Sequence, residues 1–442
     1  MSRPRPLSGF PEFLPAQRIV EQRVLASLAG TFELHGFASI ETRAVEPMAQ
    51  LARKGEIDKE IYVVRRLHAE RHGGGADADE LGLHFDLTVP FARYVLENSG
   101  HLVFPFRRYQ IQKVWRGERP QDGRYREFLQ ADIDVVGQGT LADHHDVEVA
   151  RVILEALERL HTEFGVPPAL MRVNNRRLAE GFYRGLGIDD HLAVLQRVDK
   201  LDKIGPDAVR ALLTGDLGLS DEVAGRCLEL ATISAPDESF AGRVRALGVE
   251  HPLLDEGLDQ LAAVVRAGTA AAPGRIVADL KIARGLDYYT GTVYETELAG
   301  FEHLGSICSG GRYDSLASDG RTTYPGVGLS IGVTRILVPL LAKGLLGASR
   351  PVPTCVLVAV DSEDTRDSSD ATAARLRARG IPTEVAPKAD RFGKQIRYAD
   401  RRGIPFVWFA GGEVKDIRSG DQVSADPDTW LPPEEDLRPA VG

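Results

Sequence analysis

Arginine and aromatic side chains recur along residues 109–137 in a pattern that suits phosphate chemistry. Arg116 closes the first part of this stretch, Arg119 and Arg124 lie in its middle, and Phe128 opens its last part. Guanidinium groups can bind phosphate oxygens bidentately, and an aromatic ring offers a face on which a base can stack. The stretch therefore indicates a site for a polyphosphate next to an adenine.

The periodicity of the same stretch predicts two strands joined by a long hairpin loop. Residues 109–116 and 128–135 both alternate between two faces, which is the spacing of a strand. The second run has a polar face made by Phe128, Gln130, Asp132 and Asp134. Between the runs, residues 117–126 contain Pro120 and Gly123, which favour a turn. The simpler alternative is an exposed, arginine-rich hairpin on an ordinary sheet.

A second group of polar residues precedes a predicted helix. Residues 81–88 alternate like a strand, with His84, Asp86 and Thr88 on the polar face. Thr88 followed by Pro90 then favours the start of a helix. The polar face suggests a ligand, although Asp86 and Thr88 would equally end a strand and cap that helix.

A glycine-rich junction between a strand and a helix is predicted at residues 326–339. Gly328 and Gly332 lie on one side of it, and Arg335 falls in the first turn of the helix. Such spacing also occurs in Rossmann phosphate loops, but no alternating series of strands and helices surrounds it here.

Length and composition limit the class of protein. The chain has 442 residues, 43% of them hydrophobic, which predicts two or three globular domains. No run approaches the roughly 20 apolar residues that span a bilayer, so we expect a cytoplasmic protein without membrane association. Three distant cysteines predict neither a disulfide framework nor a zinc site. The net charge of −10 argues against unspecific binding to polyanions but permits an RNA partner bound by a local basic patch.

The remaining patterns predict helices, and then a separate C-terminal domain. Residues 16–35 and 141–164 have helical spacing, and residues 170–270 are mostly helical. From residue 355 strands and helices alternate, which indicates a parallel sheet covered by helices. One predicted helix there carries Arg391, Lys394 and Arg397 on one face, which is either a solvated face or a nucleic-acid contact.

The order of these motifs resembles that of class II aminoacyl-tRNA synthetases, with the histidyl enzymes as the most similar variant. Residues 116–130 resemble the second class II motif and residues 326–339 the third, while RGLDYY at 284–289 and GSICSGGRYD at 305–314 resemble two segments specific to histidyl enzymes. In LHFDLT at 83–88, His84 stands where the family usually has arginine. Residues 16–45 resemble the first motif, which implies a homodimer.

The resemblance implies an α+β architecture in four segments. Residues 1–168 and 271–348 would form the class II catalytic domain, an antiparallel sheet flanked by helices. Residues 169–270 would form a mostly helical insertion, and residues 349–442 an α/β anticodon-binding domain.

The resemblance also implies roles for individual residues in joining histidine to tRNA(His) through a histidyl-adenylate. The catalytic residues would be Arg116 and Arg284. ATP, with Mg²⁺ on its phosphates, would be bound by Arg116, Glu118, Arg124, Phe128 and Arg335. L-Histidine would be bound by Asp86, Thr88, Gln130, Asp134, Arg284, Tyr288 and Tyr289. The tRNA would be contacted by Arg119, Gln121, Arg391, Lys394 and Arg397. No protein metal site is expected.

Requirements of the chemistry agree with part of this assignment. Attack of a carboxylate on the α-phosphate needs positioning and positive charge rather than a nucleophilic side chain. A histidine side chain needs an acceptor for one ring N–H and a partner for its other nitrogen, which Asp134 and Tyr289 could provide. The main alternative is a non-catalytic histidine sensor resembling the regulatory subunit of ATP phosphoribosyltransferase. A synthetase for another amino acid is a further alternative.

Overall fold

The computed structural model of the protein describes residues 5–52, 60–67, 80–283 and 288–442. By its internal contacts the chain divides into two compact units, residues 1–11 with 25–339, and residues 12–24 with 340–442. The first unit contains the predicted phosphate-binding hairpin, and the second contains the predicted alternation of strands and helices.

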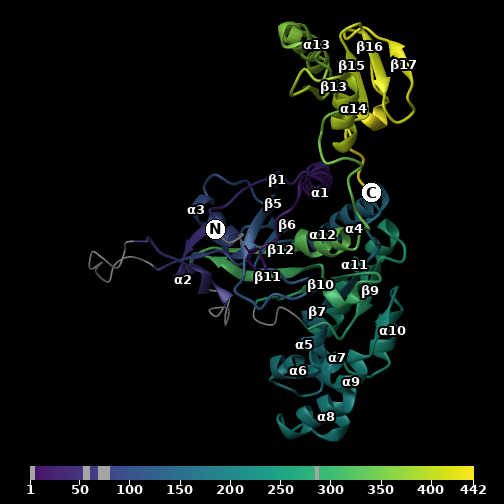
Figure 1. Ribbon diagram of the computed structural model, residues 1–442. Helices are drawn as coiled ribbons and strands as arrows, with labels where there is room; N and C mark the ends of the chain where they lie inside the picture. Colours follow the sequence, from purple (N-terminus) through teal and green to yellow (C-terminus); the bar gives the residue numbers. More distant parts are fainter. Residues whose placement is uncertain (1–4, 53–59, 68–79, 284–287) are drawn as a thin grey trace. The chain divides into compact units, whose positions relative to one another are not determined.

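In the first unit, nine strands of the described chain form one large sheet (Figure 1). Its pairs are antiparallel except for two parallel pairs, β1 with β5 and β7 with β9. In spatial order the strands are β1 (Ala38–Ser39), β5 (Phe106–Trp115), β6 (Glu127–Val136), β12 (Thr323–Gly332), β11 (Cys308–Ser318), β10 (Thr292–Leu298), β7 (Ala169–Asn175), β9 (Ile276–Asp279) and β8 (Ser234–Ala235). The predicted antiparallel sheet is confirmed.

The two strands of the central hairpin follow directly from their side-chain alternation. Strands β5 and β6 lie within a residue or a few of the predicted runs, and Ala131, Ile133 and Val135 are fully buried on one face. The register sets Arg108 opposite Asp134 and Gln112 opposite Gln130. The polar side chains of both strands are therefore gathered on the face opposite the core.

Helices cover the sheet, and two of them pack together on it. The helix α4 (His144–Phe164) contacts β6 and β12, while α11 (Pro252–Ala271) contacts β7, β9 and α4 itself. Figure 1 shows these two helices side by side. Helix α4 stops at Gly165, whose φ of 74° is left-handed and closes the helix with a backbone N–H to His161. The other long helices are α1 (Pro15–Leu34) and α12 (Val333–Ala342).

The segment before α3 (Thr88–Asn98) differs from the prediction of a strand over 81–88. Only Leu81–Leu83 forms a strand, β4, which pairs with β2 (Val45–Pro47) and β3 (Val63–Val64) beside the short helix α2 (Met48–Leu51). The reason is local, because the Asp86 carboxylate accepts the Val89 backbone N–H at 3.1 Å and begins the helix. Asp86 thus bonds to the first turn of the helix from the position before its N-cap residue, Leu87.

The helical segment of the first unit starts later than the pattern indicated. Its first residues, Ala169–Asn175, are strand β7 of the large sheet, and the Asn175 side chain then caps α5 (Arg176–Gly185). The helices that follow are α6 (His191–Val198), α7 (Leu201–Ile204), α8 (Pro206–Gly215), α9 (Asp221–Ala231) and α10 (Ser239–Arg245). Residues 276–298 contain β9 and β10, with residues 280–283 and 288–291 between them outside any strand.

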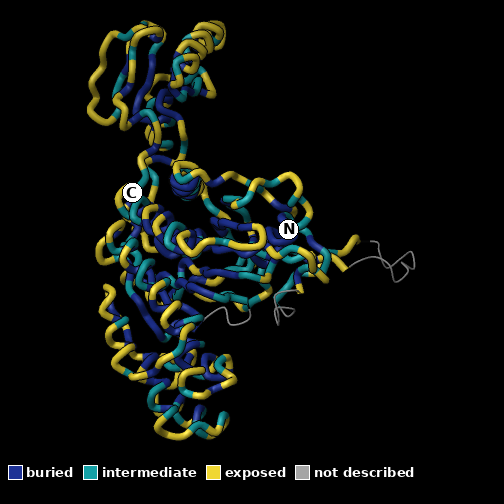
Figure 2. The backbone as a smooth tube through the Cα atoms, turned by 180° about the vertical axis from the view of Figure 1, so that it is seen from behind, coloured by how far each residue is buried: buried dark blue, intermediate teal, exposed yellow. Residues whose placement is uncertain are grey.

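The second unit contains the parallel sheet that the alternation predicted. Strand β13 (Val356–Val358) pairs in parallel with β14 (Thr383–Val385) and β15 (Phe406–Phe409), and the helices are α13 (Arg366–Ala378), α14 (Phe392–Arg401) and α15 (Glu434–Leu437). Two antiparallel strands that were not predicted, β16 (Glu413–Asp416) and β17 (Gln422–Ser424), extend the sheet. The central strands β13 and β15 are buried, whereas β17 at the edge of the sheet is exposed (Figure 2).

Candidate active site

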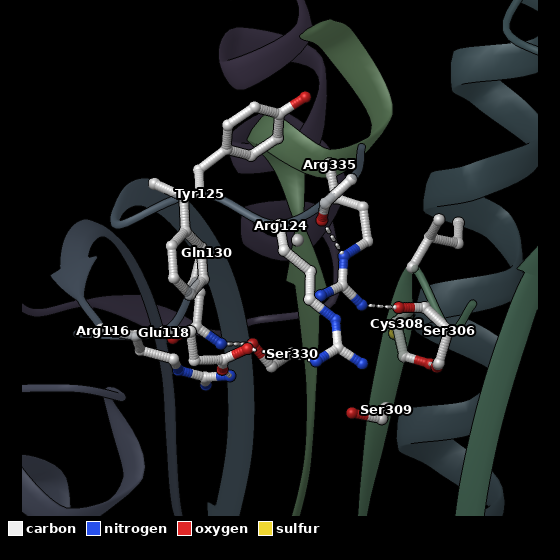
Figure 3. A pocket seen from close by; sticks show the side chains of 14 residues that line it. Arg116, Glu118, Arg124, Tyr125, Gln130, Ser306, Cys308, Ser309, Ser330 and Arg335 are labelled. Atoms are coloured by element: carbon white, nitrogen blue, oxygen red, sulfur yellow. Dashed lines mark hydrogen bonds and ion pairs between the residues drawn. The ribbon is translucent and has the colours of Figure 1, made fainter. Parts of the chain in front are cut away.

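A pocket of about 560 Å³ lies beside the β5–β6 hairpin, on its polar face (Figure 3). The hairpin and its loop supply one wall, and strands β11 and β12 with the start of α12 supply the other. Its described lining comprises Arg116, Glu118, Gly123, Arg124, Tyr125, Phe128, Gln130, Ser306, Ile307, Cys308, Ser309, Ser330, Gly332 and Arg335. All five residues predicted to bind ATP are among them.

Arg335 ties the two walls of this pocket together. Its Nε donates to the carbonyl oxygen of Gly123 at 2.7 Å, and its Nη1 donates to the carbonyl oxygen of Ser306. Gly123 lies in the hairpin loop with a left-handed φ of 71°, and a Cβ there would crowd Leu304 at 3.0 Å. The Arg335 guanidinium therefore stays in the pocket at the position that the loop and the first turn of α12 define.

Two further arginines enter the same pocket from the hairpin. Arg116 donates from Nε to the Phe85 carbonyl oxygen at 3.0 Å, and its guanidinium lies 5.1 Å from the centre of the Phe128 ring. Arg124 forms an ion pair with Glu118 at 3.2 Å, and Arg116 lies 3.9 Å from the same carboxylate. Three guanidinium groups against one carboxylate leave the pocket with an excess of positive charge, which suits a phosphate chain.

A smaller pocket of about 260 Å³ adjoins the first on the same face of the sheet. It is lined by Thr88, Asp132, Asp134, Tyr289, Ser309, Gly310, Tyr313, Gly328, Leu329 and Ser330. Ser309 and Ser330 line both pockets, so the two spaces meet at β11 and β12. The small pocket is acidic where the large one is basic, and it suits a small ligand with positive charge.

Asp134 is held in the small pocket by an ion pair and a hydrogen bond from the protein. The Arg108 guanidinium approaches one carboxylate oxygen to 2.6 Å, and the Tyr313 hydroxyl donates to the other at 2.8 Å. Behind it Gly328 leaves no room for a side chain, because a Cβ would lie 2.1 Å from Asp134 Oδ1. Burial, followed by the neighbouring Asp134 carboxylate, raises the pKa of Tyr313, which keeps its phenol proton in place.

Gln130 is linked to Asp132 through a hydroxyl that both pockets share. Its Nε2 donates to Ser330 Oγ at 2.6 Å, and Ser330 in turn donates to the carboxylate of Asp132. Burial raises the pKa of Asp132 to about 7, with Arg108 opposing the rise and Asp134 adding to it. The protonation state of the Asp132 carboxyl would therefore respond to a charged ligand bound beside it.

The remaining predicted histidine-binding residues surround the small pocket in part. Thr88 and Tyr289 line it, and the rings of Tyr288 and Tyr289 lie 4.1 Å apart. Burial raises the pKa of Tyr288, and the carboxylates of Asp86 and Asp134 raise it further. A Cβ on Gly311 would lie 2.8 Å from the Tyr289 ring, so this glycine makes room for a protein side chain. Arg284 lies outside the described residues.

His84 supports the strand from which Arg116 projects. Its ring stacks on Trp115 at 5.5 Å, and its Nε2 donates to the Lys113 carbonyl oxygen at 2.7 Å. The side chain is fully buried, and burial lowers its pKa despite that hydrogen bond. The neutral imidazole therefore acts as a packing element at the end of β5.

Three residues of the site escaped the sequence analysis. Arg108 continues the polar face of β5 by one alternation, so the same periodicity could have identified it. Tyr313 lies within the motif GSICSGGRYD, but no role was predicted for it. Arg312 is buried and forms an ion pair with Asp146 of α4 at 2.9 Å. It also donates to the carbonyl oxygens of Leu141 and Ala142, just before α4, so it anchors β11 to that helix. Only the fold brings these partners together.

Of the predicted tRNA contacts, the structure places Arg119 and Gln121 exposed on the hairpin loop. In the second unit a groove of about 1020 Å³ runs along α14, and its basic residues are Lys388, Lys394, Arg397 and Arg401. Arg391 is exposed and precedes the first turn of that helix. The basic face predicted from the sequence thus lines a concave surface over most of its length.

The described residues contain neither a metal-binding cluster nor a membrane-spanning helix. No group of three or more histidine, cysteine, aspartate or glutamate side chains there could hold a metal ion, and the three cysteines are buried and unbridged. In the same part of the chain, no helix combines the length and the apolar character needed to cross a bilayer.

Comparison with known proteins agrees with the order of motifs. A sequence model described as histidyl-tRNA synthetase matches residues 9–336, and one described as an anticodon binding domain matches residues 354–421. The histidine–tRNA ligase of Cutibacterium acnes is 67% identical, covering 100% of this chain and 99% of that protein. The histidine–tRNA ligase of Micrococcus luteus is 60% identical with the same coverage of both chains.

Solved structures show the same relationship. The crystal structure of histidyl-tRNA synthetase from a Nostoc species superposes with a TM-score of 0.84 at 33% identity, over 97% of this chain and 98% of that one. A Bacillus halodurans structure described as an ATP phosphoribosyltransferase regulatory subunit/histidyl-tRNA synthetase superposes with a TM-score of 0.73 at 19% identity, over 92% and 97%, and so shares the fold. With its two adjoining pockets and these full-length matches, the chain belongs to the histidyl-tRNA synthetase family.

Proposed function

We propose that this protein is a histidine–tRNA ligase that activates L-histidine with ATP and transfers it to tRNA(His), releasing AMP and pyrophosphate. The observation that carries the proposal is the pair of pockets that meet at Ser309 and Ser330. A basic pocket for a phosphate chain opens directly onto an acidic pocket for a small cationic ligand. Such an arrangement brings a carboxylate and an α-phosphate together.

In the first step the histidine carboxylate attacks the α-phosphate, and pyrophosphate leaves in line. The chain contributes positioning and positive charge, because the phosphate oxygens gain charge in the transition state. Arg116 and Arg284 are assigned to the α-phosphate, and Arg124 and Arg335 to the outer phosphates. Phe128 is assigned to the adenine, and one face of its ring is in cation–π contact with the Arg116 guanidinium.

The amino acid is assigned to the small pocket. Asp134 would accept one imidazole N–H, and Tyr289 would face the other ring nitrogen. Asp86, Thr88 and Gln130 would surround the α-amino group, with Tyr288 beside them. A site with such specific polar groups rejects apolar analogues strongly, because its buried partners would lose their hydrogen bonds.

Mg²⁺ fits the large pocket by the chemistry of its donors. Glu118 is the one acid among the described lining residues, and Mg²⁺ commonly takes one or two carboxylates together with substrate phosphates. Bound there, it would neutralise charge on the phosphate oxygens. Arg124 and Arg116, which flank Glu118, would remain available to the same phosphates.

The second step transfers histidine to the terminal adenosine of tRNA(His). Arg119 and Gln121 are assigned to the acceptor end, because both are exposed on the loop that borders the large pocket. The basic groove of α14 with Arg391, Lys394 and Arg397 is assigned to the anticodon. We further propose a cytoplasmic homodimer organised as catalytic segments 1–168 and 271–348, an insertion at 169–270 and an anticodon-binding domain at 349–442.

The alternative of a non-catalytic histidine sensor is weaker on the geometry of the large pocket. A sensor needs the small pocket alone, yet three arginines and Phe128 are kept in the large one. The curated relatives of highest identity named above are histidine–tRNA ligases over their full length.

One experiment separates the two functions. The purified chain is assayed for amino-acid-dependent exchange of pyrophosphate into ATP, with each other amino acid as a control, and for charging of tRNA. Exchange and charging that depend on histidine alone are expected. Histidine binding without either activity would establish the sensor instead.

A further inference from the structure

Asp132 is a buried carboxylate whose described neighbours supply it with few hydrogen bonds. The Ser330 hydroxyl donates to its Oδ1. Its Oδ2 lies 4.0 Å from the nearest Arg108 nitrogen, which is beyond hydrogen-bond distance. The residue is 3% exposed and lines the small pocket. Buried carboxylates are ordinarily paired or hydrogen-bonded, so this oxygen is suited to receive a donor from a ligand.

The two other acids of the pocket differ from Asp132 in this respect. Each oxygen of Asp134 has a protein partner: Arg108 forms an ion pair with one at 2.6 Å, and the Tyr313 hydroxyl donates to the other at 2.8 Å. Asp86 accepts the backbone N–H of Val89, in the first turn of α3, at 3.1 Å. The protein therefore binds both of these carboxylates in addition to any ligand contact, whereas Oδ2 of Asp132, a residue that lines the pocket, receives no hydrogen bond from the described residues.

The charges around Asp132 also favour a cationic ligand. Among the described residues, the ionisable groups that face it are Arg108 from β5, Asp134 from β6, Cys308 from β11 and Asp86 ahead of α3. Ser330 from β12 is its hydrogen-bond donor. The single cation Arg108 thus faces three carboxylates, those of Asp132, Asp134 and Asp86, and burial raises the pKa of Asp132 to about 7. A second positive charge in the pocket would return this carboxylate to its ionised form.

We propose that Asp132 binds the α-ammonium group of the histidine substrate through Oδ2, as an acceptor additional to Asp86, Thr88 and Gln130. The inference rests on the proposed function, because it takes histidine as the ligand of the small pocket. Ser330 connects Asp132 with Gln130 and lines both pockets. A histidine whose ammonium group binds at this point would have its own carboxylate at the boundary with the phosphate site. Binding then expels the proton from the protonated fraction of Asp132.

The first test compares histidine with its des-amino analogue, imidazole-4-propionate, by isothermal titration calorimetry on the full chain. In Asp132→Asn the affinity for histidine should fall about 10- to 100-fold, which is the typical loss of a charge-assisted hydrogen bond. The affinity for the analogue should change less than about threefold, because it has no ammonium. Asp319→Asn, at an exposed turn between β11 and β12, is the matched control and should bind both ligands normally. Equal losses for both ligands, or unchanged histidine affinity, would overturn the assignment.

A second measurement uses the unaltered chain and so does not depend on folding of the variant. Proton release on binding is obtained near pH 7 from titrations in two buffers with different ionisation enthalpies. After subtraction of the protons that each free imidazole carries at this pH, which differ because the ammonium lowers the ring pKa of histidine, histidine should release about half a proton more than imidazole-4-propionate, since the pKa of Asp132 is about 7. Equal release would overturn the proposal. If the chain bound no histidine at all, the proposed function would fail as well, whereas normal histidine-dependent exchange with these negative results would reject Asp132 alone.

Discussion

Arg108 lies directly opposite Asp134 on the β5–β6 hairpin, and its guanidinium comes within 2.6 Å of the carboxylate with both side chains buried. The pair also stacks against the core, since Arg108 lies 4.3 Å from the centre of the Phe91 ring. A buried pair of this kind fixes the position of Asp134, and loss of one partner leaves a buried charge without its counter-ion.

Arg108→Gln should therefore lower the free energy of unfolding by about 3–5 kcal/mol and also weaken histidine binding. Chemical denaturation and calorimetry measure the two effects. The double variant Arg108→Met with Asp134→Leu should recover much of the stability, because no lone charge remains, but it should not bind histidine. Recovery of histidine binding in that double variant would show that Asp134 has no part in the pocket.

Arg335 connects the hairpin loop to β11 and to the start of α12, so its loss affects both the phosphates and the shape of the pocket. Arg335→Ala should slow pyrophosphate exchange roughly 30- to 1000-fold, equivalent to about 2–4 kcal/mol of transition-state stabilisation. Arg335→Lys should recover little, because an ammonium cannot reach both carbonyl oxygens as the guanidinium does. Arg321→Ala, an exposed arginine between β11 and β12, serves as control and should retain full exchange.

Arg284 belongs to the motif RGLDYY and lies outside the described residues. As a residue assigned to the α-phosphate, its replacement by alanine should abolish adenylate formation while histidine binding persists. Calorimetry with histidine and a single-turnover assay for the adenylate test both statements. Loss of the folded state in the variant, seen by circular dichroism, would instead make Arg284 a structural residue.

His84 predicts an acid-sensitive stability. Burial lowers its pKa in the folded chain below the ordinary value of about 6.5, so the unfolded chain binds the proton first as the pH falls. Its contribution is complete above pH 6.5 and is lost as the pH falls through the folded-state pKa. The thermal midpoint of His84→Gln should therefore depend less on pH between about 7 and 5 than that of the parent chain. Identical pH profiles would mean that His84 does not titrate in this range.

The basic groove on α14 predicts a separation between the two steps of the reaction. Arg397→Ala should leave histidine-dependent exchange unchanged and reduce the charging of tRNA, mainly through a higher KM for tRNA. Arg375→Ala on α13, whose side chain pairs with Asp426 and Asp428, is the control for an exposed arginine elsewhere in the same unit. Equal charging by Arg397→Ala and the parent chain would remove this groove from tRNA recognition.

Local periodicity was sufficient to predict the hairpin, whereas the residues assigned to ATP were grouped by the family resemblance. Alternation located β5 and β6, and the residues Arg116, Arg124, Phe128 and Arg335 line one pocket as the motifs indicated. The strand expected at 81–88 was wrong beyond Leu83 because a single hydrogen bond, from Val89 to Asp86, favours a helix start over strand pairing. That choice depends on geometry that alternation does not contain.

Residues whose roles depend on distant partners could not be predicted. Tyr313 reaches Asp134 across 179 positions of sequence, and Arg312 reaches Asp146 across 166. Neither pairing can be read from the spacing of nearby residues, because each forms only when β11 pairs within the folded sheet. The same holds for the shortage of donors at Asp132, which depends on where Arg108 and Ser330 point.

The glycines behind Asp134 limit how the specificity of this protein could be redesigned. A Cβ on Gly328 would overlap the Asp134 carboxylate, and one on Gly310 would lie 2.0 Å from the Gly328 carbonyl oxygen, so main chain forms the floor of the small pocket. A floor of main chain has no side chain that can be trimmed. Space for a bulkier amino acid would have to come from Tyr289 or Tyr313, and trimming Tyr313 would also remove a donor from Asp134.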